Sequence, residues 1–246
     1  MTLEPWQWVL AVVAALAIGF AKTGIGGLGM LAVVIFTNLV PAKQASGIVL
    51  PMLCFADVVA VLSYRRHAVW VHLWRLLPWT AAGVLAGWWA MGRMDDRQAR
   101  GLIGAIILAM LAMQLWRRRQ AAKNGGEETH GWWFAPLCGV LAGFTTLIAN
   151  AAGPLLAIYL LAMQLPKLEY MGTGALFFMA LNLFKVPFMM NLGLINAQSF
   201  TLNLWLAPAV LAGALLGRKL LMKIDQKLFE NLALGLSAAA GVKLLF

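Results

Sequence analysis

The sequence predicts an all-α membrane protein made of two homologous halves with about four spans each. Its composition indicates the membrane, because 62% of the 246 residues are hydrophobic and 11% are charged, whereas a soluble domain carries about 25% charged residues. The mean hydropathy is +0.82. The net charge of +10 comes from short basic clusters between apolar runs. That pattern is typical of membrane topology, and we expect no nucleic-acid partner.

Each half is predicted to begin with an apolar segment too long for one straight span. Residues 6–40 would form a helix of roughly 52 Å, against a hydrocarbon core of about 30 Å. The segment must therefore bend, break or turn back, and the same holds for residues 131–165. The other predicted spans are 44–64, 76–92 and 101–116 in the first half and 167–191, 200–216 and 228–246 in the second.

The duplication is visible as matched residues at a nearly constant shift. The shift is 124 residues in the long segments, 125 in the next spans and 130 further on, so it changes only between elements. The matched pairs are Gly19 with Gly143, Gly29 with Gly153, Pro41 with Pro166, Asp57 with Asn182, Pro78 with Pro208, Gly83 with Gly213 and Asp95 with Asp225. The predicted repeats are residues 1–117 and 131–246, joined by a polar linker at 118–130.

The basic residues favour inverted repeats. If both long segments turn back as hairpins, one side of the membrane receives twelve Lys and Arg residues and the other six, whereas single crossings give nine on each side. Because basic residues collect on the cytoplasmic side, the hairpin arrangement with both termini outside is preferred. The twelve are Arg65, Arg66, Arg75, Arg117, Arg118, Arg119, Lys123, Lys167, Arg218, Lys219, Lys223 and Lys227.

A helix break lies inside each long segment, the first at residues 22–29 and the second at residues 145–154. A break at membrane depth must be buried in protein or line a wet cavity. The helix that follows points free N–H groups and its positive dipole end at the break. We therefore predict that the two breaks together form an anion pocket. Its candidate ligands are Lys22, Thr23, Gly24, Gly26, Gly27, Thr145, Thr146, Asn150 and Gly153.

Plainer roles stay open for these and other small or polar residues. Lys22 could snorkel to the interface, and the threonines and Asn150 could merely cap a helix. Glycine in membrane helices often serves close packing. Packing is the favoured role for Gly83, Gly87, Gly101, Gly213 and Gly217.

Three further polar residues are predicted to lie inside spans. Asp57 stands near mid-depth, where an unpaired carboxylate is costly, and Lys22 is a candidate partner. Asp57 either forms a purely structural ion pair or couples transport to protons. Asn182 occupies the equivalent position but cannot titrate. Lys185 lies three residues later on the same helix face, where it either lines the pathway or snorkels.

The sequence lacks the motifs of an enzyme or a metal site. His67, His72 and His130 form no cluster, and Cys54 and Cys138 lie in apolar surroundings. HExxH and GxSxG do not occur, and a non-transporting scaffold would not need two matched breaks. We expect no catalytic residues, no metal and no cofactor.

The two breaks and the two-fold repeat resemble the sulfite exporter TauE/SafE family over essentially the whole chain. The resemblance implies a multi-pass carrier of the bacterial inner membrane for sulfite, sulfonates and related anions, often by export, with the broken segments supplying the site. We expect a secondary transporter of small, sulfur-containing anions embedded in the lipid bilayer, with a monomer or a homodimer left open. The alternatives are an anion channel and a carrier of non-sulfur organic anions.

Overall fold

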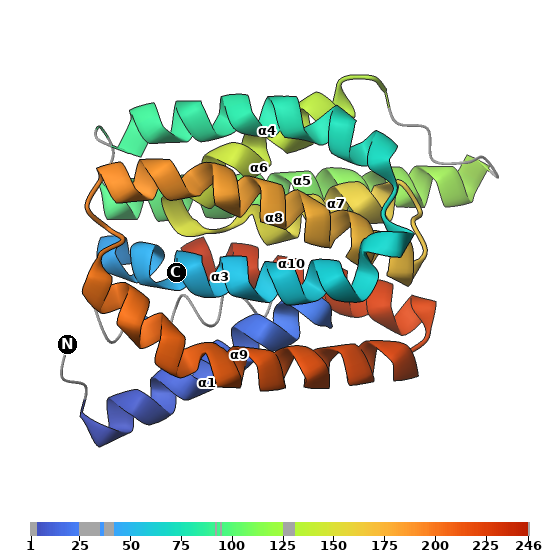
Figure 1. The fold of residues 1–246 in the computed structure, drawn as a ribbon. Coiled ribbons are helices and arrows are strands. Elements are labelled where there is room, and N and C mark those ends of the chain that lie inside the picture. Colours follow the sequence, from blue (N-terminus) through green and yellow to red (C-terminus); the bar gives the residue numbers. More distant parts are fainter. Residues whose placement is uncertain are drawn as a thin grey trace. The chain divides into compact units, whose positions relative to one another are not determined.

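The computed structural model describes residues 4–24, 35–36, 42–91, 93, 95–124 and 131–245, and Figure 1 shows their arrangement. These ranges contain α-helices and one short 3₁₀ helix but no strand, which confirms the all-α class for the described part of the chain. The elements are α1 (Pro5–Thr23), α3 (Ala42–Tyr64), η1 (Arg65–His67), α4 (Trp70–Met91), α5 (Asp96–Asn124), α6 (Phe134–Ala149), α7 (Ala152–Ala162), α8 (Lys167–Asn191), α9 (Ala197–Lys223) and α10 (Gln226–Leu245).

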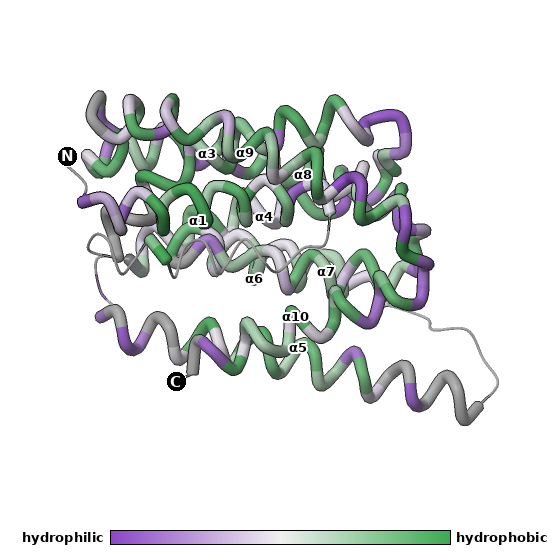
Figure 2. Tube along the Cα trace, turned by 90° about the horizontal axis from the view of Figure 1, so that it is seen from below, coloured by the Kyte–Doolittle hydropathy of each residue, from purple (hydrophilic) through white to green (hydrophobic). Residues whose placement is uncertain are grey.

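Four helical stretches are long and apolar enough to cross a membrane. They are Pro5–Thr23, Gly47–His67, Lys167–Asn191 and Ser199–Lys223, and shorter apolar helices cover Gly101–Trp116, Phe134–Ile148 and Ala152–Ala162. Hydrophobic residues run along the helices, and hydrophilic stretches gather mainly in the turns (Figure 2). The spans predicted at 76–92 and 228–246 fall on α4 and α10, and their crossing of the membrane stays a prediction.

The helices form two compact units that do not follow the two predicted repeats. Unit 1 consists of Met1–Val69 and Met171–Asp225, and unit 2 of Trp70–Tyr170 and Gln226–Phe246. Each unit therefore combines helices from both repeats: α1 and α3 with α9 in unit 1, and α4 and α5 with α6 in unit 2. The division of the sequence at the linker 118–130 stays a prediction.

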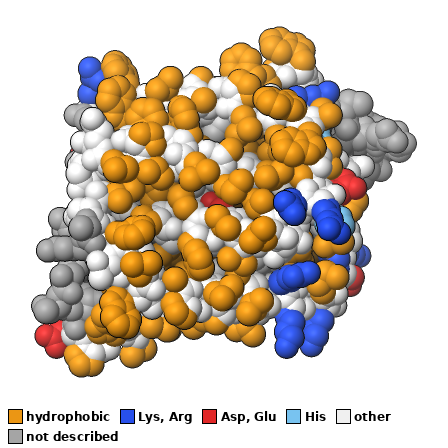
Figure 3. Space-filling view, viewed as in Figure 1, with side chains coloured by type: hydrophobic (Ala, Val, Ile, Leu, Met, Phe, Trp, Pro, Cys, Tyr) orange, Lys and Arg blue, Asp and Glu red, His pale blue; other side chains and the backbone are white. Residues whose placement is uncertain are grey.

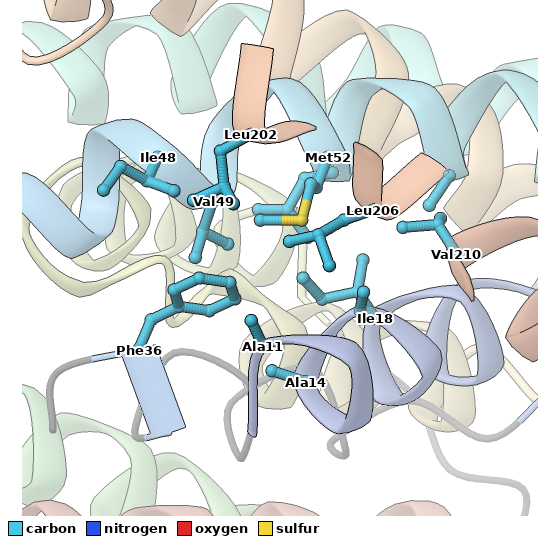
Figure 4. Close-up of a cluster of buried hydrophobic side chains, with 13 residues drawn as sticks. Ala11, Ala14, Ile18, Phe36, Ile48, Val49, Met52, Leu202, Leu206 and Val210 are labelled. Atoms are coloured by element: carbon cyan, nitrogen blue, oxygen red, sulfur yellow. The ribbon is translucent and has the colours of Figure 1, made fainter. Parts of the chain in front are cut away.

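The core of unit 1 lies where α1, α3 and α9 meet. Figure 4 shows the cluster of buried side chains that these helices share with Phe36. The contribution of α1 consists of small alanines and Ile18, so that α9 can approach the α1 backbone closely. The labelled members are Ala11, Ala14, Ile18, Phe36, Ile48, Val49, Met52, Leu202, Leu206 and Val210.

Glycine contacts fix the pairing of α1 with α9. A Cβ added to Gly19 would overlap the Val210 carbonyl, and one added to Gly213 would overlap the Leu16 carbonyl. A Cβ on Gly217 would lie 2.5 Å from the Phe20 carbonyl oxygen. The packing role predicted for these glycines of α9 is confirmed.

Unit 2 repeats the same contacts between α4 and α6. A Cβ on Gly143 would overlap the Thr80 carbonyl, and one on Gly83 would overlap the Val140 carbonyl. These partners correspond to the partners in unit 1 at the shifts of 124 and 130 residues. A Cβ on Gly87 would meet the Phe144 carbonyl oxygen at 3.0 Å, which confirms packing there. For Gly101 the packing prediction is wrong within the described part of the chain, where an added Cβ would meet nothing within 4 Å.

The second long apolar segment breaks and turns back. Helix α6 ends at Ala149 and α7 begins at Ala152. The ring of Phe134, at the start of α6, stacks on the ring of Tyr159 in α7 with centroids 5.8 Å apart, so α7 returns along α6. The two helices have 16 and 11 residues, about 24 and 16 Å, so each is shorter than a membrane core of about 30 Å. Of the corresponding first segment, residues 25–34 and 37–41 lie outside the described residues.

Candidate functional site

Helix α1 ends at the first predicted break. Gly24 leaves the helical conformation at φ −114° and ψ −103°, and its N–H still donates to the Phe20 carbonyl. A Cβ on Gly24 would lie 2.8 Å from the Phe20 carbonyl oxygen and 2.9 Å from the Gly217 Cα. The end of α1 therefore packs backbone to backbone against α9, which a larger residue at position 24 would prevent.

Two hydroxyl groups anchor this helix end. The Thr23 hydroxyl donates to the Ala214 carbonyl of α9 at 2.6 Å, and the Tyr64 hydroxyl of α3 donates to the Thr23 carbonyl at 2.7 Å. The last carbonyls of a helix have no partner within the helix, so the bond from Tyr64 satisfies one of them. The neighbouring residue, Lys22, is thus held at a fixed place between three helices.

Lys22 forms an ion pair with Asp57 inside unit 1. Its Nζ lies 2.7 Å from Asp57 Oδ1, and the Asp57 side chain is 0% exposed while that of Lys22 is 11% exposed. The ammonium also lies 3.8 Å from the ring centroid of Phe178 on α8, within cation–π range. The prediction that Lys22 pairs with Asp57 is confirmed.

The second oxygen of Asp57 is held by its counterpart in the other repeat. The Asn182 side-chain amide donates to Asp57 Oδ2 at 2.6 Å. Asp57 and Asn182 are the pair that match at a shift of 125 residues. Two positions that match in the sequence therefore touch, and their different side chains supply one acceptor and one donor.

Lys185 adds a second lysine to this buried group. Its side chain has no exposed surface, and it is close enough to Lys22, Cys54 and Asp57 for electrostatic interaction. The Lys185 side chain is enclosed by protein and does not reach the interface, which argues against snorkelling, and its role in the pathway stays a prediction. We call Lys22, Asp57, Asn182 and Lys185 the buried charge cluster.

The second break, in unit 2, is built without charges. Asn150 ends α6 in the left-handed conformation at φ 51°, and its N–H donates to the Thr146 carbonyl. The Thr145 hydroxyl donates to the Leu141 carbonyl at 2.9 Å. Asn150 thus ends α6 through its backbone, and the Thr145 hydroxyl bonds back to the preceding turn of α6; whether either side chain binds an anion stays a prediction. At the start of α7, Ala151 offers no side-chain cap, and among the described residues nothing lies within 4 Å of a Cβ added to Gly153.

A separate polar pair lies at the start of α4. His72 Nδ1 is 3.0 Å from the Tyr159 hydroxyl, and the two rings meet edge to face. Burial, followed by the charge of Arg75, lowers the pKa of His72, while Glu169 opposes this shift. The described part of the chain contains no group of three or more His, Cys, Asp or Glu residues placed to hold a metal ion.

The comparison with known families settles the affiliation of this all-α chain. The sulfite exporter TauE/SafE family matches residues 11–244, which is nearly the whole chain. The chain belongs to the TauE/SafE family. The match makes it a member of a family of membrane transporters, as the sequence motifs predict. No curated protein and no solved structure matches the chain.

For this TauE/SafE member, the structure groups the predicted site residues within each unit. In unit 1, Lys22 and Asp57 touch, and Thr23 and Gly24 form the adjoining helix end. In unit 2, the predicted residues gather at the junction of α6 and α7; they are Thr145, Thr146, Asn150 and Gly153. Gly26 and Gly27 lie outside the described residues. That both breaks form one anion pocket stays a prediction.

Two partners of the TauE/SafE cluster escaped the sequence argument. Phe178 and Tyr64 are an aromatic and a phenol in apolar helices, and no spacing marks them as neighbours of Lys22 or Thr23. The contact between Asp57 and Asn182 was not predicted either, because their match at a shift of 125 residues does not by itself place the two side chains together.

Proposed function

We propose that this chain is a secondary transporter that exports small anions carrying a sulfur oxyanion group, such as sulfite or an organosulfonate. We place it in the bacterial inner membrane as a multi-pass protein. The observation that carries the proposal is the buried charge cluster at the end of α1, in a family of sulfite exporters. A small anion is the ligand that such a cluster favours.

The side chains of the cluster explain why an anion is favoured. Two of them are lysines, Lys22 and Lys185, and Asp57 is the one carboxylate among Lys22, Asp57 and Lys185. Ammonium groups and the side-chain amide of Asn182 are donors that suit an oxyanion. A cation would instead meet two lysine side chains inside the membrane, where like charges are costly.

Asp57 is the proposed site of proton coupling. Protonation of its carboxyl group would remove the only negative charge among Lys22, Asp57 and Lys185 and strengthen anion binding. An anion and a proton would then bind together and leave together as access alternates. Asn182 cannot take this role, which restricts coupling to one of the two equivalent positions.

We further propose that the halves are inverted repeats whose breaks both contribute to the anion pathway. The α6–α7 hairpin and the matched glycine contacts of Gly19 and Gly143 support this arrangement. The uneven distribution of basic residues supports it independently. Alternating access would follow from the motion of one repeat-derived bundle against the other, as in other transporters built from inverted repeats.

A flux assay with matched lysine variants tests the function. The purified full chain is reconstituted in proteoliposomes, and the flux of radiolabelled sulfite is measured for wild type, Lys22→Met and Lys219→Met. Lys219 is an exposed lysine near the end of α9, where Lys and Arg side chains gather (Figure 3), so its loss should leave the flux unchanged. Lys22→Met should lower the flux by about tenfold or more, the effect of losing one charge-assisted contact. Equal flux in all three proteins would contradict the proposal.

Counterflow separates a carrier from an anion channel. A carrier preloaded with unlabelled sulfite accumulates labelled sulfite transiently, whereas a channel only equilibrates it. Labelled sulfonates and carboxylates in the same assay rank the sulfur anions against other organic anions. Flux without counterflow would favour the channel, and a preference for carboxylates would favour a carrier of non-sulfur anions.

A further inference from the structure

We infer that the carboxylate of Asp57 occupies the place of the transported anion, which binds by displacing it from Lys22. The inference rests on the proposed function, because it assumes that Lys22 receives the anion. Beyond the proposed function, the inference states how the site binds the substrate and which residue competes with the substrate for Lys22. Asp57 is then an intramolecular competitor of the substrate, and the strength of its ion pair with Lys22 sets the affinity of the carrier for the anion.

The contacts of Asp57 are those of a bound oxyanion. One oxygen meets the Lys22 ammonium at 2.7 Å and the other receives the Asn182 amide at 2.6 Å. A sulfonate or sulfite group presents oxygens of the same kind, and each accepts from an ammonium or an amide in the same way. The site is therefore already shaped for an oxyanion, and the chain itself supplies one.

The ammonium of Lys22 cannot easily serve both anions. The Phe178 ring covers one side of it at 3.8 Å, and Asp57 takes another. The Lys22 side chain keeps 11% of its surface exposed, while that of Asp57 has none. An incoming anion thus reaches Lys22 from its exposed side. It forms the full charge-assisted hydrogen bond with the ammonium only when the Asp57 carboxylate dissociates from Lys22.

Asn182 provides a hydrogen-bond donor for the displaced carboxylate of Asp57. Its amide binds Asp57 Oδ2 independently of Lys22, so Asp57 remains hydrogen-bonded after Oδ1 is released. A buried carboxylate without any partner would be expensive. The Asn at position 182, in place of a second Asp, therefore lowers the cost of substrate binding and avoids a second competitor.

Two isosteric substitutions at equivalent positions test the inference in opposite directions. Asp57→Asn removes the competitor and keeps the side-chain shape, whereas Asn182→Asp adds a second carboxylate. Binding of sulfite and of methanesulfonate to the full chain in nanodiscs is measured by titration calorimetry. Asp57→Asn should lower Kd by about tenfold or more, and Asn182→Asp should raise it by a similar factor, the effect of gaining or losing one charge-assisted bond. Lys22→Met combined with Asp57→Asn should cancel the gain.

Other outcomes distinguish this inference from the proposed function. If wild type binds sulfite and Asp57→Asn binds it equally or more weakly, the displacement is wrong and the carrier proposal stands. If neither anion binds wild type or any variant, the proposed function falls, and the inference falls with it. Should Asp57→Asn be poorly stable, its melting temperature is measured with and without sulfite. The stabilisation by sulfite must then exceed that of wild type, and a smaller one contradicts the inference.

Discussion

The two units use one packing scheme but differ in what they place on it. In both, glycines of two helices, one from each half of the sequence, let the backbones touch at equivalent positions: Gly19 and Gly213 in unit 1, Gly143 and Gly83 in unit 2. Unit 1 then carries Lys22 at the end of its first helix, whereas the equivalent residue in unit 2 is Thr146. The two units thus share the glycine contacts and differ in the residues at the ends of α1 and α6.

The difference also shows which contacts a duplicated chain can change. The glycine contacts join backbone to backbone, so a larger side chain at one position cannot be accommodated by changing the side chain opposite. Lys22 and Asp57 instead contact each other through side chains, and these can change while the helices stay in place. The scaffold should therefore respond alike in both units, and the charge cluster should respond in unit 1 alone.

Removal of Lys22 should produce the largest difference between the units. Lys22→Met leaves the Asp57 carboxylate buried without its cation, which costs about 3–5 kcal/mol when one partner of a buried pair is lost. Thr146→Val, at the equivalent place in unit 2, removes only a neutral hydroxyl and should cost about 1 kcal/mol or less. Reversible unfolding of the detergent-solubilised protein measures both changes.

The second step of this experiment isolates the ion pair. Adding Asp57→Asn to Lys22→Met removes the stranded charge and should restore most of the lost stability. Equal losses for Lys22→Met and Thr146→Val would mean that the cluster is no more important to unit 1 than a hydroxyl is to unit 2.

Much of the scaffold could be predicted from the sequence because glycine, proline and hydropathy report on the backbone. The break after Lys22, the break at Asn150 and the packing of Gly83 and Gly213 all follow from backbone geometry. Gly101 fails because sequence shows a small residue but not whether a neighbour approaches it. The pairing of helices across the two halves also escaped prediction, because hydropathy carries no information about partners.

The site was only partly within reach for a related reason. Burial makes a charged pair compulsory, so Lys22 and Asp57 could be matched from their depth alone. Phe178 needs no charged partner, because an aromatic ring is stable at any position of an apolar helix, so the sequence does not predict its contact with Lys22. The contact of Asp57 with Asn182 required knowing that the two positions face each other, which the shift of 125 residues suggests but does not establish.

Substitution of the contact glycines should affect both units by similar amounts. Gly19→Val and Gly143→Val each drive a side chain into a carbonyl of the facing helix. Overpacking of this kind costs about 1–3 kcal/mol. Gly101→Ala is the control, because it has open space and should be neutral or slightly stabilising. Thermal unfolding of the three variants provides the measurement, and a large loss in only one of the two units would argue against a shared scaffold.

The smallest effect on stability is expected at a pair of matched positions in α4 and α9 where the order of the polar and the apolar residue is reversed. Unit 2 has His72 followed by Leu73, and unit 1 has Leu202 followed by Asn203. Asn203 is 7% exposed, and neither its amide oxygen nor its amide nitrogen has a hydrogen-bond partner within the described residues. An unsatisfied buried amide lowers stability by about 1–3 kcal/mol.

Copying the residue of unit 2 into unit 1 should therefore help. Asn203→Leu removes the unsatisfied amide and should raise stability by roughly 1 kcal/mol, the low end of that cost because Leu must also fit the space. The reverse change, Leu73→Asn, should lower stability, since Leu73 is buried in α4. Urea unfolding of both variants in the same micelles measures the pair. A loss of stability in Asn203→Leu would show that the amide is satisfied by a bound water or by residues outside the described ranges, and that unit 1 uses position 203 for more than packing.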